Sequence, residues 1–272
     1  MTKSAEHPVM SDTEVPRLGA TEKGPTVLIL GGTSEGRALA RALADEPGLC
    51  VVSSLAGRTK SPRMPPGEVR IGGFGGAGGL ADYLRARRIA IVVDATHPFA
   101  ATMGDNAGRA CRAAGVPLLR LERPAWRAGA GDRWIEVADW DEAVPIVGAT
   151  ARRVLLALGR RELAPFAALD HVWFLVRSVE PPQPMPRFRQ IELVLARGPF
   201  ALDGERMLLA GHGIDTIVCR NSGGGSADAK LVAAREFGLR VVMRRRPARP
   251  ADLPIAATVG EAVAWVRSLR AR

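Results

Sequence analysis

The sequence predicts an α/β protein with two domains, each built on a mostly parallel sheet that is covered by helices. Three observations lead to this fold class. Apolar strands alternate with Ala- and Leu-rich helices along the chain, with short connections between them. The 272 residues, 47% hydrophobic and 24% charged, suffice for a real core in two modest domains. Segments of the first half also recur in the second half at a nearly constant distance.

The internal repeat is marked by two pairs of segments. Val154-Leu-Leu-Ala-Leu-Gly159 resembles Val27-Leu-Ile-Leu-Gly-Gly32 at a displacement of 154 − 27 = 127 residues. Further on, Gly238–Ala248 resembles Gly115–Ala125 at a displacement of 238 − 115 = 123 residues. Two related domains explain these values; the general regularity of α/β sequences is the alternative. Two such domains whose strand ends face each other form a cleft, where ligands usually bind.

The domain limits follow from composition. We expect residues 1–25 to be a disordered extension, because they are rich in Pro, Glu, Ser and Thr and contain no apolar stretch. Residues 26–123 are expected to form the first domain and residues 133–272 the second, with a linker near Glu122–Asp132. No apolar run is long enough to span a bilayer. The three cysteines lie far apart without metal-ligand spacing, so we expect reduced thiols, no metal site and a cytoplasmic protein.

The individual elements follow from apolar runs and from the glycines and prolines that bound them. In the first half we expect strands at residues 26–30, 49–55, 69–71, 89–95 and 117–121. Helices are expected there at residues 34–44, 77–87 and 100–114. In the second half we expect strands at residues 171–179 and 214–220, a glycine turn at 221–225 and a helix at 227–237.

The first strand leads through Gly31-Gly-Thr-Ser-Glu-Gly36 directly into a helix. This order brings backbone N–H groups and the positive end of a helix dipole to one point, which suits a phosphate. The spacing departs from a regular G-x-G-x-x-G, and many α/β folds turn on glycines without a ligand. The second strand lacks the terminal Asp or Glu of NAD sites, and Arg58 is placed to meet a 2′-phosphate, with Ser53 or Ser54 nearby. A solvent-facing arginine is the alternative to this NADP preference.

Two further segments of the first half carry polar or glycine-rich turns. Asp94-Ala-Thr-His-Pro-Phe-Ala100 follows a strand and opens a helix, so His97 is placed to transfer a proton or bind an anion, or else to cap and pack. Ile71–Gly79 is dense in glycine, which indicates backbone close to a ligand or a flexible surface loop.

The net charge of +10 points to an anionic partner. The basic residues are mostly arginines scattered over the chain, without the motifs of nucleic-acid binders, so we expect no nucleic-acid partner. A phosphorylated cofactor or a polycarboxylate substrate fits the planar fork of arginine; an arginine-rich proteome is the alternative. The sequence shows no Ser-His-Asp arrangement, Walker lysine or metal cluster. Hydride transfer fits this pattern because the cofactor carries that chemistry.

The chain resembles the precorrin-6A reductase family, NADPH-dependent enzymes of cobalamin biosynthesis, over roughly residues 26–250. The resemblance rests on segments in family order: Leu30–Arg37, Ser54–Arg58, Gly72–Gly76, Asp94–Ala100, Leu158–Arg160, Arg177–Pro182, Arg197–Phe200 and Asn221–Gly224 with Lys230. It implies two Rossmann-like three-layer domains with a cleft between them and NADPH on the first. It also implies reduction of one double bond of precorrin-6A to give precorrin-6B, with the cobalt form as an alternative substrate. Arg220 stands where we expect a lysine in this family, which keeps the charge.

The resemblance and the residues together give a set of candidate contacts. Those to NADPH are Gly31, Gly32, Thr33, Ser34, Glu35, Arg37, Ser54, Arg58, Gly73 and Thr96. Those to the polycarboxylate tetrapyrrole are His97, Arg160, Arg177, Arg220, Asn221, Ser222 and Lys230. His97 is also the candidate catalytic acid, with water as the alternative proton source. Hand-over of the product to neighbouring enzymes of the pathway is a further expectation.

Two rival functions are weaker. A short-chain-type oxidoreductase or epimerase needs Tyr-x-x-x-Lys, but the single tyrosine, Tyr83, is followed by Arg87. A nucleotide-sensing module would lack an arginine-lined second wall, and the arginines after residue 150 argue against it.

Overall fold

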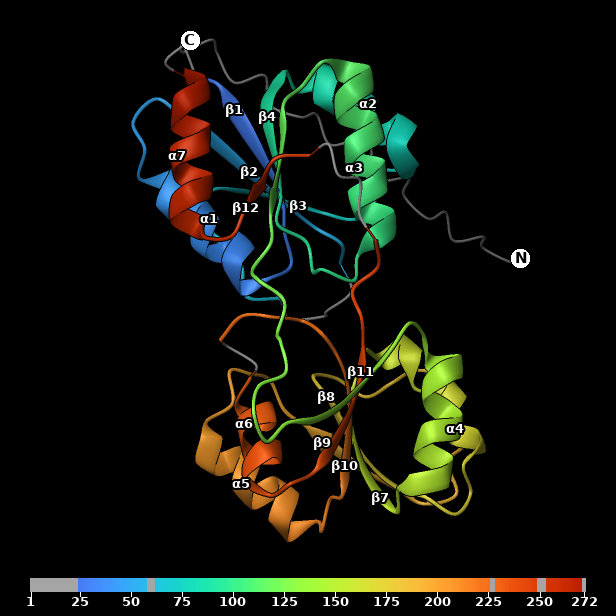
Figure 1. Cartoon of the computed structure of the whole chain (residues 1–272). Coiled ribbons are helices and arrows are strands. Elements are labelled where there is room, and N and C mark those ends of the chain that lie inside the picture. Colours follow the sequence, from blue (N-terminus) through green and yellow to red (C-terminus); the bar gives the residue numbers. More distant parts are fainter. Residues whose placement is uncertain (1–23, 58–61, 226–227, 249–252, 271–272) are drawn as a thin grey trace, which may run out of the picture.

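A computed structural model describes residues 24–57, 62–225, 228–248 and 253–270. Arg58 and nearly all of the predicted N-terminal extension lie outside the described residues. The strands of the described residues form two six-stranded parallel sheets, one in each of two stacked domains, which confirms the predicted fold class (Figure 1). Among these residues, no helix combines the length and the apolar character that crossing a membrane requires.

The first sheet has the strand order β12-β5-β4-β1-β2-β3. Its strands are β1 (Thr26–Leu30), β2 (Cys50–Leu55), β3 (Glu68–Ile71), β4 (Ile89–Asp94), β5 (Leu118–Leu121) and β12 (Ile255–Ala256). One face is covered by α1 (Ser34–Ala44) and α7 (Val259–Arg270), the other by α2 (Gly76–Ala86) and α3 (Ala101–Ala114). Every strand pairs in parallel with its neighbours.

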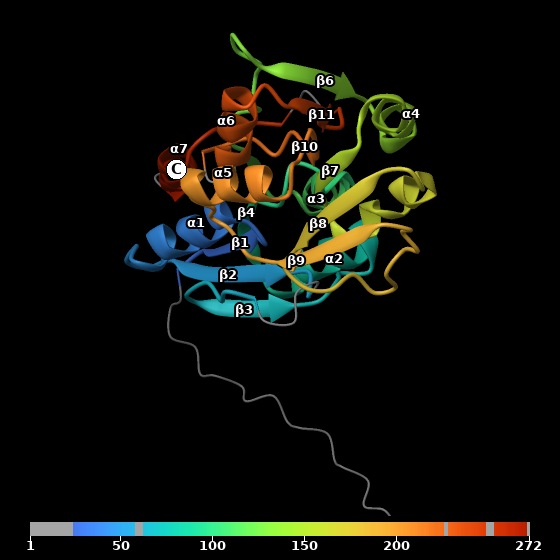
Figure 2. The same cartoon turned by 90° about the horizontal axis from the view of Figure 1, so that it is seen from below.

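The second sheet repeats this plan in the order β6-β11-β10-β7-β8-β9. Its strands are β6 (Arg133–Val137), β7 (Arg153–Ala157), β8 (Trp173–Ser178), β9 (Ile191–Leu195), β10 (Thr216–Arg220) and β11 (Arg240–Arg244). Helix α4 (Trp140–Thr150) and the short 3-10 helices η1 (Arg160–Glu162) and η2 (Ala164–Ala168) lie on one face. Helices α5 (Leu202–Gly211) and α6 (Ala229–Glu236) cover the other, and Figure 2 shows α4 and α5/α6 on opposite sides of the sheet.

The cores follow from strands that are buried on both faces. In β1, Val27 and Ile29 pack in the layer of α1 and α7, whereas Leu28 and Leu30 pack in the layer of α2 and α3. A central parallel strand therefore needs an unbroken apolar run, which is what this segment shows. Full burial of each such side chain stabilises the fold by about 1.5–3 kcal/mol.

The prediction that residues 133–272 form the second domain is wrong for the C-terminal segment, which belongs to the first domain. Strand β12 pairs with β5, and Ala262, Val263 and Val266 of α7 pack in the core of the first domain. In exchange, β6 pairs with β11 of the second sheet. The physical reason is that the chain crosses between the domains twice, after β5 and after β11, so each half of the repeat gives its last strand and helix to the other domain (Figure 1).

The repeat itself extends through both exchanged segments. The start of β12 follows that of β6 by 255 − 133 = 122 residues, and the start of β11 follows that of β5 by 240 − 118 = 122 residues. The two crossings are therefore equivalent points of the repeat, and the carboxyl ends of the two sheets are held against each other there.

Candidate functional site

The carboxyl ends of the two sheets meet at a direct side-chain contact. His97, which follows β4 in the first domain, has its Nε2 atom 3.2 Å from Oγ of Ser222, which follows β10 in the second. Ligands of parallel α/β sheets bind at the carboxyl ends of the strands. The contact therefore marks the junction of the two candidate binding regions.

The turn after β1 is open where a phosphate would lie. The Gly31 N–H donates to the Ser54 carbonyl (2.9 Å), which fixes the turn against β2. Gly32 has φ +112°, a conformation that favours glycine, and a Cβ built there would meet nothing within 4 Å. The turn thus combines a glycine-only backbone with free space above it.

Thr33 caps α1 and sets the direction of its first N–H groups. Its Oγ1 accepts from the Gly36 N–H (3.0 Å) and donates to the Ala95 carbonyl (2.7 Å), which ties the start of α1 to the end of β4. The N–H groups of Ser34 and Glu35 belong to the first turn, where the helix itself supplies no acceptor. This end of α1 is suited to bind a phosphate.

The glycine-rich loop before α2 follows β3, the edge strand next to β2. Arg70 donates to the carbonyls of Gly72 and Gly73 (both 2.6 Å), and its guanidinium lies over the Phe74 ring at 3.9 Å. A Cβ at Gly73 would meet nothing within 4 Å. Arg70, which the sequence reasoning missed, thus shapes a loop that leaves open space beside the predicted cofactor contact Gly73.

Thr96, another predicted cofactor contact, is held by a buried ion pair. Arg120 forms an ion pair with Asp94, and both side chains are 3% exposed. Arg120 also donates to Oγ1 and to the carbonyl of Thr96 (both 3.0 Å), and Thr96 Oγ1 donates to Asp94 (2.7 Å). Sequence reasoning missed Arg120, although a charged residue inside the apolar segment Leu118–Leu121 signals a buried carboxylate partner.

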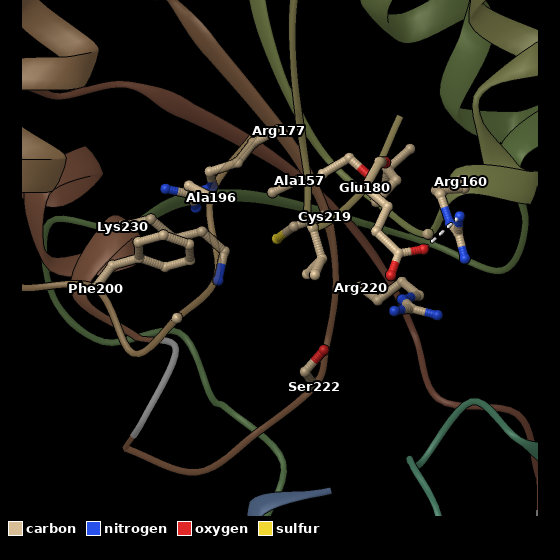
Figure 3. Close-up of a pocket in the computed structure, with 15 residues that line it drawn as sticks. Ala157, Arg160, Arg177, Glu180, Ala196, Phe200, Cys219, Arg220, Ser222 and Lys230 are labelled. Atoms are coloured by element: carbon tan, nitrogen blue, oxygen red, sulfur yellow. Dashed lines mark hydrogen bonds and ion pairs between the residues drawn. The ribbon is translucent and has the colours of Figure 1, made fainter. Parts of the chain in front are cut away.

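A pocket of about 360 Å³ occupies the carboxyl end of the second sheet. Five of the predicted substrate contacts line it: Arg160, Arg177, Arg220, Ser222 and Lys230. Figure 3 shows Arg177 and Lys230 on one side, Arg160 and Arg220 on the other, and Ser222 at the edge. The structure therefore gathers four cationic side chains around one cavity, from segments that the sequence separates by up to 70 residues (160 to 230).

Each arginine of this pocket is oriented by a carboxylate. Arg160 contacts Glu180 (3.1 Å), Arg220 contacts Glu162 (3.1 Å), and Arg177 forms a hydrogen-bonded ion pair with Glu205.

Two cationic side chains of this pocket, Arg220 and Lys230, are affected by burial. The Nε atom of Arg220 is buried and has no hydrogen-bond partner within the described part of the chain. Burial, aided by Arg177, lowers the pKa of Lys230. Buried polar groups normally have hydrogen-bond partners, so the unpartnered Nε of Arg220 indicates a place for an anionic ligand.

Asn221 lies behind the pocket rather than in its lining. Its side-chain amide accepts from the Trp126 N–H (2.8 Å) and donates to the Trp126 carbonyl (2.9 Å), so it clamps the segment that follows the first crossing. Gly223 and Gly224 have φ values of +69° and +71°. A Cβ at Gly223 would lie 2.1 Å from Nη2 of Arg246, so a side chain of the protein itself occupies this part of the turn.

His97 is held as one neutral tautomer. Its Nδ1 accepts from the Phe99 N–H (3.2 Å), so in the neutral ring Nε2 carries the proton and donates to Ser222. Burial and the nearby guanidinium groups, Arg220 first among them, lower the pKa of His97 to about 2. The ring is therefore uncharged at neutral pH and is better suited to orient the Ser222 hydroxyl than to supply a proton.

Comparison with known proteins decides the family. Residues 26–267 match the family described as Precorrin-6x reductase CbiJ/CobK. The chain belongs to this family. A precorrin-6A reductase of Rhodococcus erythropolis is 49% identical over 247 residues, covering 90% of this chain and 99% of the relative. A solved structure of a CobK precorrin-6A reductase superposes with a TM-score of 0.85 at 44% identity, covering 90% of this chain and 97% of that one.

More distant members of the family carry a different name. A cobalt-precorrin-6A reductase of Priestia megaterium is 28% identical over 232 residues, covering 81% of this chain and 90% of the relative. The family match runs through both crossings and most of α7, so the likeness includes the exchanged segments as well as the two separate halves.

Proposed function

We propose that this chain reduces one double bond of precorrin-6A with NADPH, giving precorrin-6B in cobalamin biosynthesis. The observation that carries the proposal is the pairing of an open phosphate turn in the first domain with a cationic pocket in the second. The two are joined where His97 contacts Ser222. The names of relatives that are 46–49% identical support the reaction.

The residues present fit a phosphorylated dinucleotide. Gly31 and Gly32 provide the open turn, and the first N–H groups of α1, at Ser34 and Glu35, would hold the pyrophosphate. Gly73 leaves space after β3, two strands away from β1, and the buried end of β2 at Ser54 carries no carboxylate that would repel a 2′-phosphate. NADPH supplies a hydride when it is bound there.

The pocket of the second domain would bind the acetate and propionate groups of the macrocycle. Arg160, Arg177, Arg220 and Lys230 offer forked or point-charge donors, and Arg220 Nε is without a partner in the described residues. The low dielectric of this partly enclosed site strengthens each charge–charge contact compared with water. The macrocycle would then be held with its reacting carbons toward the first domain.

Ser222 and His97 would orient the substrate rather than protonate it. Because His97 Nε2 donates to the Ser222 oxygen, the hydroxyl proton of Ser222 is free to point toward the pocket that it lines. Water is the favoured proton source, since the His97 pKa of about 2 leaves the ring neutral at pH 7 and its remaining Nε2–H is a very weak acid.

The metal-free macrocycle is the favoured substrate. Relatives named for precorrin-6A are 46–49% identical to this chain, whereas those named for the cobalt form are 28–29% identical. The proposal includes a cytoplasmic location and hand-over of the product to the next enzyme of the pathway. The free cysteines Cys50, Cys111 and Cys219 suit a reducing compartment.

The test is anaerobic NADPH oxidation followed by absorbance, first with precorrin-6A and then with cobalt-precorrin-6A. We expect turnover with NADPH and little with NADH, and a higher kcat/KM for the metal-free substrate. Tight NADPH binding without reduction of either macrocycle would refute the substrate assignment and leave the cofactor assignment standing. Faster turnover of the cobalt form would reverse the choice between the two substrates.

A further inference from the structure

Arg123 connects the two candidate binding regions. Its Nε donates to the carbonyls of Ser222 and Gly223 (both 2.8 Å), on the turn that borders the substrate pocket. Its Nη1 donates to the Glu35 carboxylate (2.7 Å), in the first turn of α1. Both side chains are largely buried, at 13% and 23% exposure, so the ion pair is partly shielded from water. One guanidinium therefore touches the cofactor side and the substrate side at once.

The turn of the second domain is shaped around this side chain. A Cβ built on Gly224 would lie 2.4 Å from Cδ of Arg123, so only glycine leaves room for the arginine stem. The Gly224 N–H in turn donates to the carbonyl of Pro124, next to Arg123 (3.3 Å). The glycines of Asn221–Gly225 thus have a structural explanation that requires no ligand in their place.

A repeat-equivalent arginine gives an internal comparison. Arg246 follows Arg123 by 246 − 123 = 123 residues and lies at the second crossing. It also holds the turn, donating to the carbonyls of Asn221 (3.0 Å) and Ser222 (3.1 Å), and it pairs with Glu122 (2.8 Å). Arg123 differs from it in pairing with Glu35 of α1 instead of Glu122.

The geometry points to Glu35 and Arg123 as a positioning pair that couples occupation of the cofactor turn to the shape of the substrate turn. Glu35, predicted as a cofactor contact, would act through its carboxylate on the substrate side, while its backbone N–H remains in the phosphate turn. This inference rests on the proposed function for the identity of the two ligands, but the contact itself does not depend on it. Coupling of this kind is reciprocal: each ligand raises the affinity for the other by the same factor.

The variants Glu35→Gln and Arg123→Lys break the pair in different ways. Gln keeps the size of Glu35 but removes its charge, and Lys keeps the charge of Arg123 but cannot reach the carbonyls and the carboxylate together. The matched control is Glu46→Gln, which also neutralises an arginine-paired glutamate, beside Arg267 and far from both turns.

Two measurements test the coupling. The first is peptide-resolved hydrogen exchange of residues 221–224 in the ligand-free proteins. The second is the affinity for precorrin-6A with and without NADP⁺, which binds the cofactor turn but carries no hydride to transfer. In the unmodified protein we expect NADP⁺ to raise precorrin-6A affinity at least about fivefold. In both variants the factor should fall below about twofold. The factor compares precorrin-6A affinity with saturating NADP⁺ and without it, so a change in NADP⁺ affinity itself does not enter it. Glu46→Gln should behave as the unmodified protein.

The outcomes separate the inference from the proposed function. Faster exchange of residues 221–224 in both variants, but not in the control, supports the link even if neither ligand binds, in which case the proposed function fails. Unchanged exchange in both variants overturns the link. Faster exchange with an undiminished coupling factor also overturns the inference, because Arg123 would then stabilise the turn without positioning it for the substrate.

Discussion

The turns after the first strand of each repeat, β1 and β7, differ although they occupy equivalent places in the two sheets. After β1, Gly32 is open and α1 begins at once with its first N–H groups unused by the helix. After β7, the Gly159 N–H donates to the carboxylate of Glu162 (3.1 Å), and a Cβ on Gly159 would lie 2.7 Å from that carboxylate. The second turn therefore carries its own anion where the first leaves room for one.

Glu162 also explains why the second domain suits a different ligand. Its carboxylate contacts Arg220 (3.1 Å) and Arg244 (3.4 Å) and accepts from the indole of Trp140 (3.2 Å). An internal carboxylate at this point excludes a phosphate by charge and by space, and it orients arginines around the neighbouring pocket. Glu162 is the repeat equivalent of Glu35, at a displacement of 162 − 35 = 127 residues. The two domains thus share this glutamate, but in the second domain its carboxylate lies on the turn itself, whereas in the first it pairs with Arg123 and leaves the turn open.

The largest effect is expected in the second region, from Arg220→Met. Loss of a charged hydrogen bond to the substrate and of the partner of Glu162 should lower kcat/KM for the macrocycle about 100-fold, or about 2.7 kcal/mol. The Kd of NADPH should change less than about twofold, because Arg220 lies in the substrate pocket. Steady-state kinetics and a fluorescence titration of NADPH check this. Arg220→Lys should keep most of the activity; equal losses in both variants would contradict a role in charge attraction.

A smaller effect, in the first region, is expected from Gly32→Ala. At φ +112° a side chain is strained, and its Cβ would occupy the space proposed for the pyrophosphate, so NADPH affinity should fall about tenfold, or about 1.4 kcal/mol. The matched variant is Gly159→Ala, at φ −70°, where only the mobile end of Glu162 is in the way. It should leave NADPH affinity unchanged. Weakened NADPH binding in Gly159→Ala and not in Gly32→Ala would reverse the assignment of the two turns.

Local signals in the sequence predicted the first region well. The helix at residues 34–44 and the glycine turn before it are found as predicted, because a Thr cap and glycines act over a few residues. In the second domain the 3-10 helices η1 and η2 stand where α1 stands in the first. The sequence did not reveal the contact of Glu162 with Arg220 at this place, because the two residues lie far apart along the chain.

Non-local pairings account for most of what was missed. The two-residue strand β12 has almost no pattern of its own, and only its pairing with β5 shows to which sheet it belongs. Arg123 and Arg246 were visible as a repeated Arg-Pro-Ala, but their convergence on one turn depends on the two crossings. Asn221 was assigned to the substrate for the same reason, whereas the structure pairs its amide with Trp126. Its contact with substrate stays a prediction.

A still smaller effect is expected from Thr33→Val, which removes the side-chain cap of α1. Loss of a capping hydroxyl typically costs about 1 kcal/mol in the free energy of unfolding. Thr150→Val, at the end of α4, is the control, because its hydroxyl donates to the carbonyl of Ile146 within the helix (2.6 Å) and caps no helix start. Urea unfolding of both variants measures the difference. If both variants lost the same free energy of unfolding, the Thr33 hydroxyl would contribute no specific capping stabilisation to α1.

The smallest effect concerns His97, at the junction of the two regions. Its pKa of about 2 in the folded protein lies below the unfolded value of 6.5. As pH falls through 6.5, the unfolded chain therefore binds a proton at His97 that the folded protein does not bind, and the free energy of unfolding decreases. At pH 6 this loss is about 0.8 kcal/mol relative to pH 8. His97→Gln, which keeps an N–H donor for Ser222, should remove that part of the pH dependence in urea unfolding at the two pH values. If the variant and the unmodified protein lost equal stability between pH 8 and pH 6, His97 would carry a proton in the folded state and would regain its place as a candidate acid.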